Sequence, residues 1–166
     1  MRSFEGLDEL IAERGDGLLA AAVLLTGTRA AGEDLLQTAL ERLMRRWRRV
    51  EPGNREGYLR RTLYHLAIDQ WRLRRRKPLV FAPVEPPSQP DGTETVHLRQ
   101  ALVQALGLLP PRQRAVLVLR YWEQLSEAEA AEVLGCSIGT VKSTAARGLA
   151  RLRELTAAWD NEPAQV

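Results

Sequence analysis

Hydrophobic residues recur at helical spacing along most of this chain. Between residues 31 and 49 they follow i, i+3, i+4 and i+7 spacing, which predicts an amphipathic helix. Similar spacing predicts further helices over residues 4–25, 55–75, 96–109 and 112–122. We expect the first of these to be interrupted around Gly15 and Gly17. With no strand pattern and no internal repeat, the chain is predicted to be all-α.

A proline-rich segment separates the helical patterns into two groups. Residues 78–95 contain five prolines, a density that excludes helix and favours an extended connection. We therefore predict two small helical domains joined by a flexible, Pro-rich linker. The boundaries that follow are 1–77 for the first domain, 78–95 for the linker, 96–157 for the second domain and 158–166 for a tail.

The second domain ends in the pattern of a helix-turn-helix. Ser126 followed by Glu129 is a capping box, which predicts the start of a helix. Gly135 is the residue type preferred just past a helix C-terminus, and Ser137 can cap a second helix over residues 138–153. Two helices joined by a short turn with a glycine form a helix-turn-helix, whose second helix reads the DNA major groove. The second domain is thus predicted to have four helices.

The residue types around this turn suit a close helix crossing. Ala130 and Ala131 are small enough to let the two helices approach. Leu134, Cys136 and Val141 can fill the space between them. The other face of the second helix carries side chains that can contact base edges or phosphates. They are Thr140, Lys142, Ser143, Thr144, Arg147 and Arg151.

The basic residues are almost all arginine and lie in blocks. The chain has 24 basic and 21 acidic residues, for a net charge of +3, and its only lysines are Lys77 and Lys142. The arginines gather within residues 42–49, 60–76 and 147–153. Such blocks indicate a polyanionic partner, although solvated helix faces also produce them.

The sequence lacks the features of an enzyme. His65 and His97 are the only histidines and have no second metal ligand at suitable spacing, so we predict no metal site. Cys136, the only cysteine, occupies a packing position and cannot form an internal disulfide. No glycine-rich phosphate loop or nucleophile elbow occurs. We therefore expect a protein that is not an enzyme and uses no cofactor.

The sequence gives no indication of export or membrane insertion. Its N-terminus lacks the basic-then-apolar pattern of a signal peptide, and no apolar run approaches the ~18 residues of a membrane span. A single cysteine fits a reducing compartment. We expect a cytoplasmic protein with no membrane partner.

Three segments of the chain together resemble one protein family. They are residues 31–47, AGEDLLQTALERLMRRW, residues 55–78, REGYLRRTLYHLAIDQWRLRRRKP, and residues 109–153, LPPRQRAVLVLRYWEQLSEAEAAEVLGCSIGTVKSTAARGLARLR. The family is that of the extracytoplasmic-function (ECF) RNA polymerase sigma factors. The first segment is similar to its polymerase-binding helix, the second to its −10-reading helix and the third to its promoter −35-binding domain. On this basis the chain is identified as a member of the family in its minimal two-domain form.

The resemblance implies a subunit that binds the RNA polymerase core and directs promoter-specific initiation by recognising −35 duplex and melted −10 DNA. The −35 role would fall on the six helix-turn-helix side chains named above. Capture of unstacked −10 bases needs positive charge and planar groups. The residues that supply them are Arg60, Arg61, Tyr64, His65, Asp69, Arg72 and Arg75. Docking on the core would fall on Asp34, Leu35, Gln37 and Glu41.

The implied partners are the polymerase core, promoter DNA and, where one exists, an anti-sigma factor. The chain departs from the family pattern at Thr144 and Ala145, where many members have Arg and Leu, and at His65, where Asn is common. These departures leave the promoter bases open. Trp71 is expected to pack in the core of the first domain rather than to stack on a base.

Two other functions are compatible with the sequence. A stand-alone dimeric helix-turn-helix regulator would bind a palindrome without polymerase. A helical protein-binding module would leave the basic residues of the second domain unused and show no salt-sensitive affinity for DNA.

Overall fold

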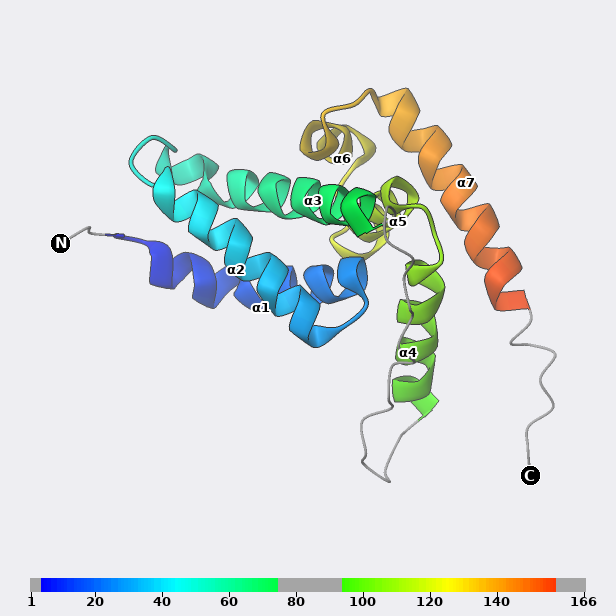
Figure 1. Cartoon of the computed structure of the whole chain (residues 1–166). Coiled ribbons are helices and arrows are strands. Elements are labelled where there is room, and N and C mark those ends of the chain that lie inside the picture. Colours follow the sequence, from blue (N-terminus) through cyan, green and yellow to red (C-terminus); the bar gives the residue numbers. More distant parts are fainter. Residues whose placement is uncertain (1–3, 75–93, 158–166) are drawn as a thin grey trace.

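The computed structural model describes residues 4–74 and 94–157, and within these ranges it is built from helices alone (Figure 1). In chain order the elements are α1 (Leu7–Thr26), α2 (Arg29–Arg45), η1 (Pro52–Asn54), α3 (Arg55–Arg74), α4 (Glu94–Gly107), α5 (Pro111–Leu117), η2 (Val118–Trp122), α6 (Glu127–Leu134) and α7 (Ile138–Ala157). The prediction of an all-α chain is confirmed. Most of the predicted linker, 78–95, and the whole predicted tail, 158–166, lie outside the described residues.

The first domain consists of α1, α2 and α3, each of which contacts the other two. The side chains of their common core are mostly leucine: Leu18, Ala22, Leu35, Ala39, Leu43, Trp47, Leu59, Leu63 and Leu66. Gly32 allows α1 and α2 to approach closely, because a Cβ at this position would lie 2.9 Å from the backbone nitrogen of Val23.

α1 runs without a break from Leu7 to Thr26, so the predicted interruption around Gly15 and Gly17 is wrong. A glycine in a helix interior costs about 1 kcal/mol relative to alanine. The packing of α1 on α2 and α3 outweighs that cost. The helix ends instead at Gly27, whose φ of 94° is a conformation that favours glycine.

α2 ends at Arg45, earlier than the predicted end at residue 49. Beyond it the chain turns, so that the ring of Trp47 is buried. The guanidinium carbon of Arg55 lies 3.8 Å from the centroid of that ring, and Arg55 donates hydrogen bonds to the backbone carbonyls of Glu5 and Trp47. The basic end of this segment is therefore a turn held by a cation–π contact, not a further helical turn.

The second domain contains α4, α5, η2, α6 and α7 and confirms the predicted helix-turn-helix. The capping box of Ser126 and Glu129 starts α6, and Gly135, with φ of 67°, ends it. The Ser137 hydroxyl accepts a hydrogen bond of 3.1 Å from the backbone N–H of Thr140 in the first turn of α7. Pro111 is the first residue of α5, as expected. The predicted helix over residues 112–122 is α5 followed by the π-helical turn η2.

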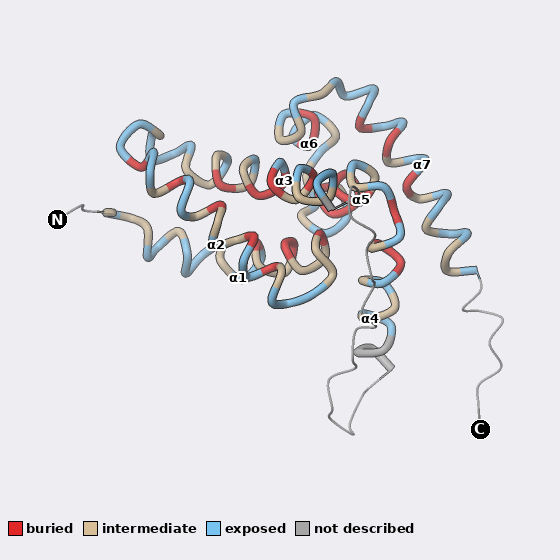
Figure 2. Tube along the Cα trace, in the orientation of Figure 1, coloured by how far each residue is buried: buried red, intermediate tan, exposed pale blue. Residues whose placement is uncertain are grey.

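The two domains pack against each other, which the sequence did not predict. α1 contacts α4, α5 and η2, while α3 contacts α5 and α6. Figure 1 shows the helices that meet at this boundary, and Figure 2 shows buried stretches of chain there. One hydrophobic cluster crosses the boundary: Ala21, Leu25, Tyr64 and Ile68 from the first domain lie with Ala115, Val116, Val118, Leu119, Ala130, Ala131 and Val141 from the second. The structure is therefore a closed arrangement of two domains.

Candidate nucleic-acid interface

α7 presents a polar, basic face to solvent. Of the six predicted −35 residues, five are exposed: Thr140, Lys142, Ser143, Arg147 and Arg151. Lys142 Nζ lies 3.5 Å from Glu127, and Arg151 pairs with Glu154 at 2.9 Å. Within the described parts of the chain, Arg147 makes no ion pair, so its guanidinium is available to a phosphate or a guanine.

Thr144 is buried, with 8% of its surface exposed, so its prediction as an exposed base-contacting residue does not fit this structure. It lies on the same face of α7 as the buried Val141 and Gly148, three before and four after it. This face packs on α5. A Cβ on Gly148 would lie 3.2 Å from Leu117.

α3 carries the predicted −10 residues along the side that faces the second domain. We call the described members of this set the α3 face: Arg60, Arg61, Tyr64, His65, Asp69 and Arg72. Arg61, His65, Asp69 and Arg72 are exposed, whereas Arg60 is half-buried and Tyr64 is fully buried. The last predicted member, Arg75, lies outside the described residues.

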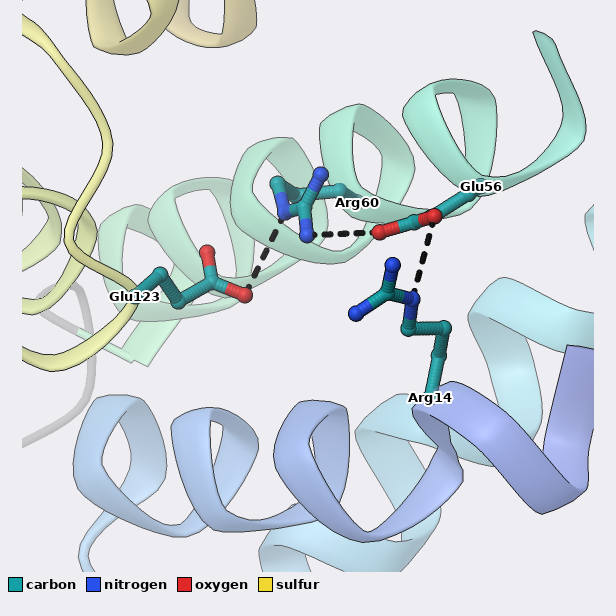
Figure 3. A network of polar contacts seen from close by, with 4 residues as sticks. All are labelled: Arg14, Glu56, Arg60 and Glu123. Carbon is teal, nitrogen blue, oxygen red and sulfur yellow. Dashed lines mark hydrogen bonds and ion pairs between the residues drawn. The ribbon is translucent and has the colours of Figure 1, made fainter. Parts of the chain in front are cut away.

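Arg60 joins the two domains through an ion-pair network (Figure 3). It bonds to Glu56 at 2.9 Å within α3 and to Glu123 of the second domain at 3.2 Å, and Glu56 also pairs with Arg14 of α1. Burial alone would lower the pKa of Arg60, but the carboxylates of Glu123 and Glu56 raise it. The guanidinium is thus held charged between two acidic groups.

Tyr64, which the resemblance assigned to the capture of −10 bases, is buried, and this assignment is corrected; its neighbour Ile68 is buried as well. Both are buried in the cluster shared with the second domain. Burial, and after it the charge of Glu123, raises the pKa of the Tyr64 hydroxyl well above its ordinary value. In this arrangement the Tyr64 ring is covered by protein and is not available for stacking on a base. Trp71 is half-buried.

Two hollows mark where the α3 face meets the helix-turn-helix. A cleft of about 440 Å³ lies between Asn54 and Arg61 on one side and Glu129 and Glu132 of α6 on the other. A smaller one, of about 60 Å³, has both Asp69 of α3 and Thr140 of α7 in its lining. Beside them, His65 Nε2 lies 3.1 Å from the backbone carbonyl oxygen of Val133. The structure therefore brings the two predicted DNA-contacting surfaces together.

Some of the predicted polymerase-docking residues are exposed and one is buried. Asp34, Gln37 and Glu41 are exposed, and their spacing places them on one face of α2. Leu35 is fully buried in the core of the first domain, so its assignment to a docking surface is corrected. Its apolar side chain belongs to the inward face of the amphipathic pattern.

Arg114 is a structural residue that the sequence did not single out. It is 5% exposed and donates hydrogen bonds to four backbone carbonyls, those of Leu106, Gly107, Leu109 and Leu25. Burial lowers the pKa of Arg114 to about 10. The first three acceptors close the turn after α4, and the last belongs to α1 of the other domain. A basic residue between Gln113 and Ala115 gives no sign of burial in the sequence.

Other kinds of site find no support among residues 4–74 and 94–157. No group of three His, Cys, Asp or Glu side chains in this part of the chain could hold a metal ion. None of the helices that the structure describes is both long and apolar enough to cross a membrane.

Two family models match separate parts of the chain. Residues 10–77 match the model of Sigma-70 region 2, and residues 99–152 match that of Sigma-70 region 4. The chain is 41% identical over 154 residues to the RNA polymerase sigma-E factor of Streptomyces coelicolor, covering 92% of this chain and 87% of that protein. It is 34% identical to the ECF RNA polymerase sigma factor SigE of Mycolicibacterium smegmatis, over 95% of this chain and 64% of the other.

The solved structures agree with this. The sigma factor RpoE from Bartonella quintana, crystallised with the anti-sigma factor NepR, aligns with a TM-score of 0.73 and 27% identity, over 90% of this chain and 96% of that one. Sigma factors are non-catalytic subunits that direct transcription initiation from promoters. The chain belongs to the ECF family of RNA polymerase sigma factors.

Proposed function

We propose that this chain docks on the RNA polymerase core through α2, holds the melted −10 strand on the α3 face and reads the −35 duplex with α7. It would work in the cytoplasm and catalyse no reaction itself. Its role would be to direct RNA polymerase to promoters. The observation that carries the proposal is the exposed face of α7, which follows the capped turn of the helix-turn-helix and includes Arg147, a residue with no ion pair in the described part of the chain. The domain boundaries 1–77 and 96–157 are part of the same proposal.

The chemistry of α7 suits a duplex. Thr140, Lys142 and Ser143 lie in its first turns, the part of a recognition helix that contacts base edges. Arg147 and Arg151 are one and two turns further on, where a helix leaving the groove meets phosphates. Thr144 supports the helix from its buried side and has no role in base contact in this proposal.

The chemistry of α3 suits a single strand. Arg61 and Arg72 are exposed cations on the same side of α3 as Asp69. The Asp69 carboxylate can accept a hydrogen bond from a base amino group. His65 adds a planar ring. The exposed carboxylates of Asp34 and Glu41, with Gln37 between them, form the proposed contact with the core enzyme.

An anti-sigma factor is a further proposed partner. The Bartonella quintana relative was solved with one bound, and its alignment spans 90% of this chain. A partner of that class would hold both domains away from polymerase and DNA.

The test is co-purification with bacterial core polymerase followed by run-off transcription on fragmented genomic DNA from the same source. Stable association and discrete new start sites would support the proposal, and aligning the starts would give both promoter elements. The alternative of a stand-alone regulator predicts no association with the core and a shift of a palindromic duplex by the protein alone, as a dimer. A protein-binding module predicts neither.

A further inference from the structure

We propose that Glu127 is a positioning residue for DNA recognition, which holds Lys142 of α7 so that its ammonium group serves a base contact rather than a general contact with phosphates. Glu127 is the first residue of α6, the first helix of the helix-turn-helix. The inference rests on the proposed function of α7, and it adds a residue outside the recognition helix to the reading of the −35 duplex.

Glu127 links three elements of the second domain. Its Oε2 lies 3.5 Å from Lys142 Nζ on α7, and its Oε1 lies 3.9 Å from the Arg120 guanidinium on η2. Arg120 also donates a hydrogen bond to the backbone carbonyl of Leu125. The carboxylate therefore lies between two cations from different elements, and the shorter of the two contacts is the one with the recognition helix.

The two cations differ in how far they are already fixed. The Arg120 side chain is 26% exposed and is held by its bond to Leu125, whereas the Lys142 side chain is 64% exposed. An exposed lysine is a point charge on a flexible stem of four carbons. Since Arg120 orients the carboxylate from the protein side, Glu127 restricts where the Lys142 ammonium lies before any DNA is bound.

The cations of the exposed α7 face are not equivalent. Arg147 makes no ion pair in the described part of the chain, and Arg151 pairs with Glu154, three residues further along α7 itself. Lys142, in contrast, pairs with a residue of the other helix of the motif. That partner fixes the ammonium relative to both helices, which a partner on the same helix does not.

The chemistry of an ammonium group allows it to be held and to bind DNA at the same time. It has three N–H donors, so the contact with Glu127 leaves donors for O6 and N7 of a guanine. A phosphate contact needs only a positive charge within reach. A neighbouring carboxylate limits that reach and offsets the charge. The pair of Glu127 and Lys142 therefore favours a contact of defined geometry over one that any sequence offers.

Two simpler roles for Glu127 make different predictions. A carboxylate in the first turn of a helix stabilises the helix through its dipole, which would affect unfolding alone. A carboxylate that only repels DNA would weaken binding to every duplex equally and would do so without Lys142. The positioning role requires Lys142 and depends on the DNA sequence.

Glu127→Gln tests the proposal on the full chain, because it removes the charge at almost unchanged size. The matched control is Glu132→Gln, the same change at an exposed position of α6 that makes no ion pair within the described residues. Lys142→Met, alone and combined with Glu127→Gln, completes a double-mutant cycle. Circular dichroism checks that every variant keeps the helical content of wild type.

Acylation of Lys142 without DNA gives the first readout. The chain has two lysines, Lys77 and Lys142, so mass spectrometry after a limiting dose of acetic anhydride resolves each of them. An exposed ion pair contributes up to about 1 kcal/mol, so Lys142 should react roughly two- to fivefold faster in Glu127→Gln than in Glu132→Gln. Equal rates would overturn the proposal, whether or not α7 reads a promoter.

Binding of duplex DNA, measured by fluorescence anisotropy, gives the second readout. The probes are the −35 duplex mapped by run-off transcription and a duplex of equal length and random sequence. Glu127→Gln should bind the random duplex roughly two- to fivefold more tightly than Glu132→Gln, with a salt slope steeper by about 0.9, because one phosphate contact is added. Its affinity for the −35 duplex should change by less than about twofold, so its preference for that duplex falls.

The double-mutant cycle decides whether Lys142 carries the effect. In the Lys142→Met background, Glu127→Gln should leave the preference for the −35 duplex unchanged. Equal tightening on both duplexes, or a loss of preference that persists without Lys142, would overturn the positioning role. A wild type that shows no preference between the duplexes would contradict the proposed function itself, on which the acylation readout does not depend.

Discussion

Replacing Arg114 with methionine removes a charge that is enclosed by backbone carbonyls. The guanidinium donates at 2.7 Å to Leu106, at 2.7 Å to Leu25, at 2.9 Å to Gly107 and at 3.2 Å to Leu109. Methionine fills similar space but offers these oxygens no donor. Three of them lie in the turn between α4 and α5, and the fourth lies in the first domain, so the substitution loosens both the turn and the domain boundary.

The size of the effect follows from two opposing contributions. Hydrogen bonds from a charged donor stabilise a protein by about 1.5 kcal/mol each at the lower end, so four bonds give about 6 kcal/mol. Burial of the charge, which lowers the pKa of Arg114 to about 10, offsets about 3 kcal/mol of this. The guanidinium remains charged at neutral pH. Arg114→Met should therefore destabilise the fold by about 3 kcal/mol.

Thermal and urea unfolding at neutral pH measure this. For a chain of this size, about 3 kcal/mol corresponds to a Tm lower by roughly 6–12 °C. Arg112→Met is the matched control, because Arg112 is an exposed arginine in the same helix and should change stability by less than about 0.5 kcal/mol. If Arg114→Met unfolded within about 2 °C of Arg112→Met, the carbonyl contacts would not be the stabilising interaction inferred here.

Three further predictions concern other elements. Arg147→Ala should weaken −35 duplex binding by the holoenzyme roughly tenfold and lower the salt slope of binding by about 1, measured by fluorescence anisotropy at several salt concentrations. Gly32→Ala should destabilise the first domain by about 1–3 kcal/mol because its Cβ meets Val23, whereas Gly17→Ala, with open space around it, should stabilise by up to about 1 kcal/mol in the same urea unfolding experiment. Tyr64→Phe should leave stability unchanged or higher at pH 7. Because the raised pKa of Tyr64 makes the folded state keep a proton that the unfolded chain releases near pH 10, wild type should lose stability relative to the variant as the pH rises past about 10. If the difference in urea midpoint between wild type and Tyr64→Phe were the same at pH 7 and at pH 10.5, the last prediction would be contradicted.

The features that the sequence predicted correctly are those that depend on residues close together in the chain. The capping box at Ser126, the left-handed Gly135 and the apolar Val141 are each determined by neighbours within a few residues, and the structure has them as expected. The periodicity of α2 also predicts which of its side chains face the core. That periodicity places Leu35 on the buried face, whereas the resemblance to the family assigned it to the docking surface, and the structure agrees with the periodicity.

Long-range packing explains what the sequence missed. Tyr64 and Ile68 stand on the side of α3 that is outward within the first domain, and only the second domain buries them. Arg114 looks like a surface cation because its four acceptors are carbonyls, which carry no side-chain pattern. Contacts between distant elements of this kind leave no local periodicity, so the closed arrangement could be found only from the structure.

Site-specific photocrosslinking on a promoter complex tests the central claim most directly. A crosslinker at exposed Ser143 of α7 and another at exposed Arg61 of α3 would be introduced separately into the chain bound to core polymerase. The account predicts adducts from position 143 in the −35 duplex and from position 61 in one strand of the melted −10 element, both dependent on the core enzyme. Adducts from position 143 in two halves of a palindrome without polymerase, and none from position 61, would contradict it.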